Sequence, residues 1–600
     1  MVAVRGNRMT SAYRPVPEPV LLERLRMGIF NLECRFALAR FEWRTRAASH
    51  TNEKMLRAIL KCNRDTEFGR KHGFPGLTRH EGLDLVTAFR REVPLSVYGD
   101  YHSYIERVAA GEQRVLSADR VLVLAGTGGT TDRPKRIPRT RDTQRHHAML
   151  VVRAAQAVID RAVPGASGSA RGINLMSFYA PPAATGSVVP HMSGPGSGIR
   201  RVRRHIARFW CSPEAVFGLA DQPTALYLHA LFALLDRSAL YIETPFAPQV
   251  VGWLALIERH QRQLVEDVRN GTLPAHLKLT ATERDRLNAC LHPNPERAEE
   301  ITKALALGFE GILPRLWPTM AYIRTVTSGS FALALPRLRW LAGPELTIHS
   351  GCHAASEGVI GINLRVDGRN EYVLALGSAY FEFIPLAAID EAQPVTLDVD
   401  ELRPGDDYEV VLTNSAGLYR YRMGDVIRVT GLYGTAPTFQ YLFRRGTILN
   451  LVGEKTSECH TTEAVMTALR ELLGVGVTVK DYAVAGAFED GLGRYTFYVE
   501  LQSHSGMAPE TLSRAADLLD QALCEVNPYY LRNGRAAERL ASARIRIVRP
   551  GTFDSFAALK LERTGGISLG QVKSPRVLSG TEESQFFEQR VSGWTDGRLD

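Results

Sequence analysis

A segment rich in glycine and threonine follows a short apolar run and is the first place where this sequence could bind an anion. The run VLVLAG (Val121–Gly126) is typical of a buried strand, and TGGTTDRPK follows it directly. Glycines let backbone N–H groups approach an anion closely, and threonine hydroxyls donate further hydrogen bonds. The lysine follows a proline, which differs from a Walker loop, and a tight turn is the alternative interpretation. The candidate phosphate ligands are Thr127, Gly128, Gly129, Thr130, Thr131 and Lys135.

A single acidic residue, Glu357, lies between apolar segments in GCHAASEGVIGINL. Carboxylates are preferred ligands of Mg²⁺, so Glu357 could hold that ion at the mouth of a strand. The alternative is an acid at a helix N-terminus, where it would only offset the helix dipole. The residues alone do not decide between these two interpretations.

A second acidic residue, Asp425, ends the segment LYRYRMGD. Before it, Tyr419 and Tyr421 alternate with Arg420 and Arg422, a pattern that predicts a strand with one aromatic and one basic face. We expect Asp425 to follow in a turn. There its carboxylate could accept hydrogen bonds from both hydroxyls of a ribose, or it could have a purely structural role in the turn.

The elements that must position these residues alternate between apolar strands and helical patterns such as Val251–Val268, which favours an α/β fold. The pattern changes after about Arg445, where an amphipathic helix (463–473) and a hairpin (482–501) indicate a compact α+β unit. We therefore predict a flexible tail over 1–20, a large body with helices flanking β-sheets over 21–445, and a small carboxyl-terminal domain over 446–600.

Composition excludes several classes of protein. The chain has 600 residues, of which 45% are hydrophobic and 23% charged, and both fractions are typical of globular proteins. Its formal net charge is 73 − 64 = +9. It has no uninterrupted apolar stretch of membrane-spanning length and no secretory signal. Its odd number of scattered cysteines, 7, predicts reduced thiols and a cytoplasmic protein. The arginine-rich run over 200–208 is interpreted as a solvated helical face, so we expect neither a nucleic-acid nor a membrane partner.

Together these segments resemble the Gretchen Hagen family of acyl-acid amido synthetases, within the adenylate-forming superfamily. TGGTTDRPK is similar to the family's phosphate loop, HAASE (His353–Glu357) to its Tyr-x-Ser-Ser-Glu, and LYRYRMGD matches its counterpart intact. TSGS (Thr327–Ser330) and SLGQVKSPRVL (Ser568–Leu578) also match, in the family's order. Three departures stand out: the phosphate loop is one residue shorter, His353 replaces a tyrosine and Ala355 replaces a serine.

The resemblance implies an ATP-dependent ligase that adenylates a carboxylic acid and then transfers the acyl group to an amine, typically that of an amino acid. Magnesium would be held by Glu357, and Lys573 of a mobile carboxyl-terminal domain would be the catalytic lysine. The remaining nucleotide contacts implied by the resemblance are Ser328, Gly329, Ser330, His353, Ala354, Ser356, Asp425 and Arg444.

Two other functions remain open from the sequence. An acyl-CoA synthetase would share the adenylation step but pass the acyl group to a thiol. A non-catalytic relative would bind the nucleotide only, although Glu357, Asp425 and Lys573 are all retained. We expect a monomer whose partners are the small-molecule acid and amine.

Overall fold

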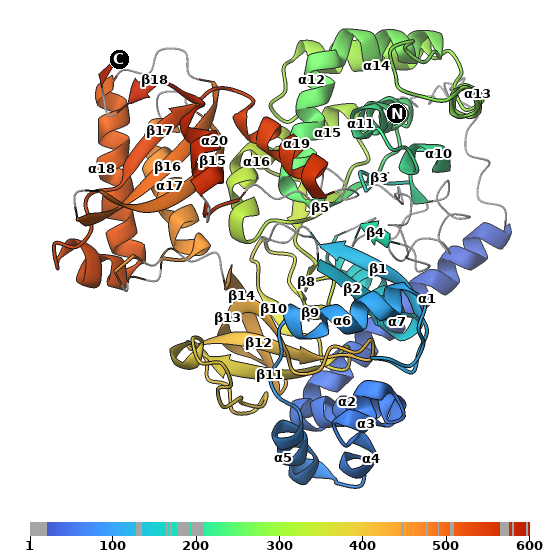
Figure 1. The fold of residues 1–600 in the computed structure, drawn as a ribbon. Coiled ribbons are helices and arrows are strands. Elements are labelled where there is room, and N and C mark those ends of the chain that lie inside the picture. The colour runs from blue at the N-terminus through green and yellow to red at the C-terminus, as the bar shows by residue number, and fades with distance from the viewer. Residues whose placement is uncertain are drawn as a thin grey trace, which may run out of the picture.

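The structure is a computed structural model in which several sheets are surrounded by helices (Figure 1). It describes residues 21–127, 135–163, 166, 171–176, 191–193, 209–445, 449, 451–452, 454, 456–473, 478–489, 491–503, 509–564, 575–578, 581–595 and 598–599. The predicted tail over 1–20 and Lys573 lie outside this range. Most of the predicted phosphate loop, residues 128–134, does so as well.

The amino-terminal part is helical and leads into a β-hairpin. The predicted strand VLVLAG is β1 (Val121–Thr127), which pairs antiparallel with β2 (Lys135–Thr140) and parallel with β4 (His191–Ser193). Val123, Leu124 and Ala125 are buried, as a continuous apolar run predicts. The helices of this part are α1 (Leu21–Arg44), η1 (Thr45–Ala47), α2 (Ala48–Asn63), α3 (Glu67–Lys71), α4 (Phe74–Leu77), α5 (Gly82–Glu92), α6 (Tyr98–Ala109), α7 (Arg141–His147), η2 (Ala148–Ala154) and α8 (Ala155–Ala162).

A parallel four-stranded sheet and its helices form the second part. Its strand order is β3 (Ile173–Asn174), β5 (Tyr241–Phe246), β6 (Tyr322–Val326) and β7 (Thr347–His349). Parallel neighbours need long crossovers, and helices supply them here. They are α10 (Glu214–Phe217), α11 (Gln222–Leu235), α12 (Ala247–Asn270), α13 (Ala281–Asn288), α14 (Pro295–Ala306), α15 (Ile312–Leu316), η5 (Gly329–Ala334) and α16 (Leu335–Ala342).

The most apolar helix, α11, is buried along almost its whole length between its neighbours and the parallel sheet. A helix that is hydrophobic on all sides is expected in such a position. In the described ranges, no helix is both long enough and apolar enough to cross a bilayer.

A seven-stranded sheet forms the third part, and its core is shared with helices α2 to α6. The strand order is β11 (Tyr380–Pro385), β12 (Asp407–Thr413), β13 (Tyr421–Tyr433), β14 (Ala436–Arg444), β10 (Tyr372–Leu374), β9 (Val359–Ile362) and β8 (Cys352–Ala354), all antiparallel. A short helix, η6 (Leu386–Ala388), follows β11. This sheet and the parallel one confirm the predicted α/β class.

The carboxyl-terminal residues form a unit with its own five-stranded sheet, drawn in orange to red in Figure 1. The predicted hairpin is confirmed as β15 (Thr478–Glu489) and β16 (Leu492–Ser503), followed by β17 (Arg544–Val548), β18 (Val591–Thr595) and β19 (Arg598–Leu599). Its helices are α17 (Glu458–Leu473), α18 (Pro509–Val526), η7 (Tyr530–Arg535), α19 (Thr552–Thr564) and α20 (Thr581–Glu588). Leu333 of η5 packs against its core, so this unit touches the large body close to the candidate nucleotide residues.

The segment LYRYRMGD differs from its predicted form. The basic face predicted for Arg420 and Arg422 is not exposed, because both guanidinium groups are buried in ion pairs with carboxylates of β11 and β12. Arg420 Nε donates to Glu382 of β11 at 3.1 Å, and Arg422 Nη2 donates to Glu409 of β12 at 2.5 Å. Asp425 lies within β13 and not in a turn, which corrects the second expectation.

Arg420 has an unusual backbone conformation just before β13. Arg420 has φ of +44°, the left-handed region that side chains other than glycine rarely adopt. Its carbonyl accepts from the Ser96 N–H, and its own N–H donates to Thr413 Oγ1. Both arginines reach carboxylates that are distant in the sequence, so strand periodicity alone could not predict that this face is buried.

Removing the Arg422 guanidinium should strongly destabilise the protein, because it would leave the fully buried Glu409 carboxylate without its partner. We expect Arg422→Met to lower the free energy of unfolding by about 3–5 kcal/mol, as for other broken buried ion pairs. Arg428→Gln is the matched control: Arg428 pairs with Asp407 across the same two strands but is half-exposed, and the loss should be below about 1 kcal/mol. Urea unfolding measures both, and equal losses would contradict this interpretation.

Candidate active site

The predicted site residues lie on three different sheets that meet at one place. Lys135 begins β2 of the hairpin sheet, and Ser328 and Gly329 follow β6 at the carboxyl edge of the parallel sheet. His353, Asp425 and Arg444 lie on β8, β13 and β14 of the seven-stranded sheet. Ligands commonly bind beyond the carboxyl ends of parallel strands, where the following loops converge. Residues more than three hundred positions apart in the sequence thus surround one region.

Asp425 is held by two neighbours. Arg444 is its direct register partner on β14, and Arg444 Nε donates to Asp425 Oδ1 at 2.7 Å. His353 Nε2 donates to Asp425 Oδ2 at 3.2 Å. Burial would raise the pKa of the Asp425 carboxyl, but the Arg444 guanidinium and the His353 hydrogen bond outweigh it and hold that pKa well below its usual value. Asp425 is therefore a fixed negative charge at physiological pH.

An aromatic wall stands beside this carboxylate. The imidazole of His353 stacks on the ring of Tyr441, with centroids 5.0 Å apart and an angle of 28°. Phe439 and Tyr372 lie edge-on or tilted against the same imidazole. Gly329, with φ of +59°, faces Tyr441 so closely that a Cβ atom there would lie 3.2 Å from the ring. The glycine lets the chain after β6 approach the aromatic wall.

Lys135 links the separate clusters electrostatically. Its Nζ lies 3.4 Å from the Tyr421 hydroxyl and 5.8 Å from the centre of the Tyr98 ring. Burial lowers the pKa of the ammonium group, Glu357 and Asp425 oppose that change, and Arg444 adds to it. The charges of all three groups act on this lysine, so all three lie near it.

Glu357 lies in the turn between β8 and β9, so the interpretation as an acid at a helix N-terminus is wrong. Its side chain is buried, with 5% exposed. Within the described residues no hydrogen bond is made to this carboxylate, although the charges of Lys135, Arg139 and Arg444 all act on it. A buried carboxylate that is close to several cations and has no hydrogen-bond partner among the described residues is a suitable ligand position.

The turn that carries Glu357 is anchored on both sides. Arg139 Nη1 donates to the Ser356 carbonyl at 2.9 Å, and Asn414 Nδ2 donates to the Glu357 carbonyl at 2.8 Å. Arg139 is itself buried, its Nε has no partner among the described residues, and burial lowers the pKa of its guanidinium to about 10. It is a positioning residue for the turn.

For several predicted residues, the structure describes no side-chain contact with the candidate active site. Gly128, Gly129, Thr130, Thr131 and Lys573 lie outside the described residues. Thr127 is the register partner of Lys135, so the residues between them connect the two strands of a hairpin. Ala354 is exposed at the end of β8, Ser356 contributes its carbonyl group to Arg139, and Ser330 lies in η5.

Three residues with roles at the site were not identified from the sequence. Tyr421 was recognised only as part of a face, and neither Tyr441 nor Arg139 was considered. The alternation of Phe439, Tyr441 and Phe443 could have indicated an aromatic face on β14. Nothing local in RIPRT marks Arg139 as buried, because its environment is built by the distant turn at Ser356.

The chain matches all three domains of one family over most of its length. The GH3 family N-terminal domain matches residues 37–347, its central domain 372–444 and its C-terminal domain 460–582. A probable indole-3-acetic acid-amido synthetase from Oryza sativa subsp. japonica is 30% identical, over 92% of this chain and 96% of the relative. A jasmonoyl–L-amino acid synthetase from the same organism is 29% identical, over 93% and 97%.

A solved structure agrees with these relatives. The GH3.15 acyl acid amido synthetase superposes with a TM-score of 0.80 at 26% identity, covering 94% of this chain and 97% of that one. Fold and relatives together define an amide-forming ligase. The protein belongs to the GH3 family, as its resemblance to the Gretchen Hagen family implied.

Alanine at position 329 should disturb the aromatic wall. Gly329→Ala must adopt a positive φ and also press its methyl group against Tyr441, and overpacking typically costs about 1–3 kcal/mol. Gly368→Ala is the matched control, since Gly368 has φ of +81° but no atom within 4 Å of a Cβ. We expect Gly329→Ala to lower the unfolding free energy by at least about 1 kcal/mol more than the control. Equal losses of unfolding free energy would show that the Tyr441 ring moves away from the methyl group without measurable cost.

Proposed function

We propose that this amide-forming ligase uses ATP to adenylate a small carboxylic acid and then transfers the acyl group to the amine of an amino acid. The observation that carries the proposal is the position of Lys135 within electrostatic reach of Glu357, Asp425 and Arg444. The relatives support it, because one is named a probable indole-3-acetic acid-amido synthetase and another a jasmonoyl–L-amino acid synthetase.

In the first step a carboxylate oxygen of the acid attacks the α-phosphorus of ATP, and the bond to pyrophosphate breaks. Catalysis of such a transfer rests on positioning and on stabilising the charge of the phosphoryl oxygens. Lys135 and Arg444 are the described cations in position to do this, with backbone and hydroxyl donors of residues 127–131 completing the phosphate contacts. Asp425 sets the orientation of Arg444 through their hydrogen bond.

The nucleoside would lie against the aromatic wall. A carboxylate can accept about four hydrogen bonds, and Asp425 uses one for Arg444 and one for His353, so it can still accept from ribose hydroxyls. One face of the His353 imidazole packs on Tyr441, which leaves the other face for adenine. Ser328, Gly329, Ser330, Ala354 and Ser356 would line the same pocket.

Magnesium would be held by Glu357 together with phosphate oxygens of the nucleotide. Mg²⁺ is usually bound by one or two carboxylates plus substrate phosphates, so a single buried acid is enough. No group of three or more His, Cys, Asp or Glu side chains in the described residues could hold a metal alone. The donor set therefore fits an ion that arrives with ATP, whose role would be to offset charge on the departing pyrophosphate.

In the second step the amine attacks the acyl carbonyl, AMP leaves, and the amine gives up a proton. We propose that Lys573 of a mobile carboxyl-terminal domain, residues 446–600, acts in the first step and that movement of this domain over the large domain, 21–445, separates the two steps. Leu333 of η5 packs against the carboxyl-terminal core, so the two domains meet beside the candidate nucleotide residues. We propose a monomer in the cytoplasm, and the free state of all seven cysteines supports that location.

The test is to measure which acceptor releases AMP. Wild-type protein should catalyse exchange of pyrophosphate into ATP only when its carboxylic acid is present, and a panel of acids identifies that substrate. Addition of amino acids should then release AMP and yield an amide. Release of AMP by coenzyme A but by no amine would instead support the acyl-CoA synthetase alternative. If no acid in the panel supports exchange although the protein binds ATP, the result would favour a non-catalytic relative.

Replacing Glu357 by glutamine should impair adenylation because the neutral amide is a poor ligand for Mg²⁺. We expect Glu357→Gln to lose at least about tenfold in the exchange rate and to need more magnesium for half-maximal rate, as when a charged contact is lost. Glu345→Gln, at an exposed acid, is the control and should behave as the wild type. Identical magnesium curves for Glu357→Gln and wild type would exclude this role.

A further inference from the structure

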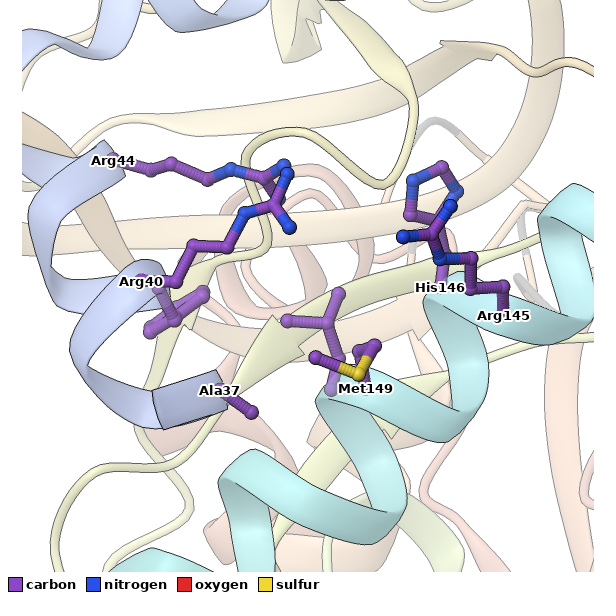
Figure 2. A pocket seen from close by; sticks show the side chains of 8 residues that line it. Ala37, Arg40, Arg44, Arg145, His146 and Met149 are labelled. Atoms are coloured by element: carbon purple, nitrogen blue, oxygen red, sulfur yellow. The ribbon is translucent and has the colours of Figure 1, made fainter. Parts of the chain in front are cut away.

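A cavity of about 100 Å³, lined by none of the residues assigned to the candidate active site, lies between α1 and the continuous helix formed by α7 and η2 (Figure 2). Its apolar lining consists of Ala37, Phe41, Met149 and Leu150. Its polar lining consists entirely of groups that carry or can gain positive charge, namely Arg40, Arg44, Arg145 and His146. Figure 2 shows Arg40 and Arg44 extending from α1 toward Arg145 and His146 on the opposite helix.

Other arginines at the contact of α1 with these helices are neutralised, whereas those of the cavity are not. Arg153 pairs with Glu33, and Arg161 pairs with Glu42. By contrast, Arg40 and Arg145 form no ion pair with any carboxylate in the part of the chain that the structure describes. Arg44 Nη1 donates to the carbonyls of Leu376 and Gly377, both at 3.4 Å, and Arg44 pairs with no carboxylate among the described residues. These are long hydrogen bonds, and they leave its charge unbalanced.

The acid nearest to the cavity does not balance the cluster. Asp142 Oδ2 lies 3.6 Å from His146 Nδ1, beyond hydrogen-bond distance, and it accepts a hydrogen bond from Ser415 Oγ at 2.7 Å. The cations also repel one another. Burial lowers the pKa of Arg44, and the charge of Arg40 lowers it further. Burial lowers the pKa of His146, Asp142 opposes this, and Arg44, Arg145 and Arg40 add to it.

Arg40 and Arg145 are exposed and Arg44 is half-buried, so solvent screens part of their repulsion, but three guanidinium groups around one small cavity still favour an anion among them. Guanidinium groups bind phosphate and carboxylate through paired N–H donors. A carboxylate carries only one charge, whereas phosphate carries nearly two at neutral pH and has oxygens enough for all three arginines. The number of cations and the small volume therefore favour a compact phosphate group.

We propose that this cavity binds a phosphate dianion, either free or as a small phosphate monoester, at a site separate from the nucleotide site. The four cationic residues come from α1 and α7, and none of them is among the residues assigned to ATP. The bound anion would join α1 to α7, so its effect should be seen in binding and in stability and need not alter the chemistry.

Titration calorimetry with inorganic phosphate, at constant ionic strength and with AMP saturating the nucleotide site, tests the proposal. Wild type should bind one phosphate, and the melting temperature should rise with its concentration. Arg40→Gln and Arg145→Gln should each weaken binding by about tenfold or more, because each removes a charged hydrogen-bond donor. Arg141→Gln is the control, since Arg141 is as exposed as Arg40 and Arg145 and lies on the same helix as Arg145, but outside the cavity.

The outcomes separate the alternatives. Tighter binding of glycerol phosphate than of inorganic phosphate would identify a monoester as the ligand, and the reverse would identify free phosphate. The proposal is overturned if phosphate binds only when AMP is absent, since it would then occupy the nucleotide site. It is also overturned if benzoate binds more tightly than either phosphate, or if Arg40→Gln and Arg145→Gln bind as well as Arg141→Gln while remaining folded by circular dichroism.

Discussion

The buried ion pairs of Arg420 and Arg422 are the constraint on which the candidate active site depends. Each guanidinium is buried beside a carboxylate of a neighbouring strand, and burial of either charge alone would be costly. The pairs fix the start of β13 against β11 and β12. Because Tyr421 and Asp425 lie on the same strand, the ion pairs also determine where the hydroxyl next to Lys135 and the carboxylate next to Arg444 stand.

The network around Arg420 extends this order to the helical part of the chain. Glu382 accepts from Arg90 of α5 and from Thr396 as well as from Arg420, and Arg420 Nη1 donates to the carbonyls of Arg90 and Val93. Hydrogen bonds in such a buried network strengthen one another, although Arg90 Nη2 has no partner among the described residues. The seven-stranded sheet and the amino-terminal helices are thereby held in one register, and the hairpin that carries Lys135 is held with them.

Much of the fold could be predicted from the sequence, because its signals are local. The apolar run of β1, the hairpin of β15 and β16 and the helix α18 all follow from periodicity and turn residues. The convergence of Glu357, Asp425 and Lys135 could be inferred only through a family resemblance, since no local pattern brings three sheets together. The inward orientation of Arg420 and Arg422, the partners of Asp425 and the burial of Arg139 were not predictable, because distant residues create them.

Position 420 must meet two requirements that conflict: a left-handed backbone, which favours glycine, and a guanidinium group, which only arginine supplies. Glycine would satisfy the backbone but removes the guanidinium, and a β-branched or aromatic residue would satisfy neither. Lysine lacks the planar fork that reaches Glu382, Thr396 and two carbonyls together. Natural selection should therefore tolerate almost no replacement here, although Arg420 takes no part in the chemistry. In comparisons of related sequences, invariance at this position would record the requirements of folding, and ranking residues by invariance alone would mistake it for a catalytic one.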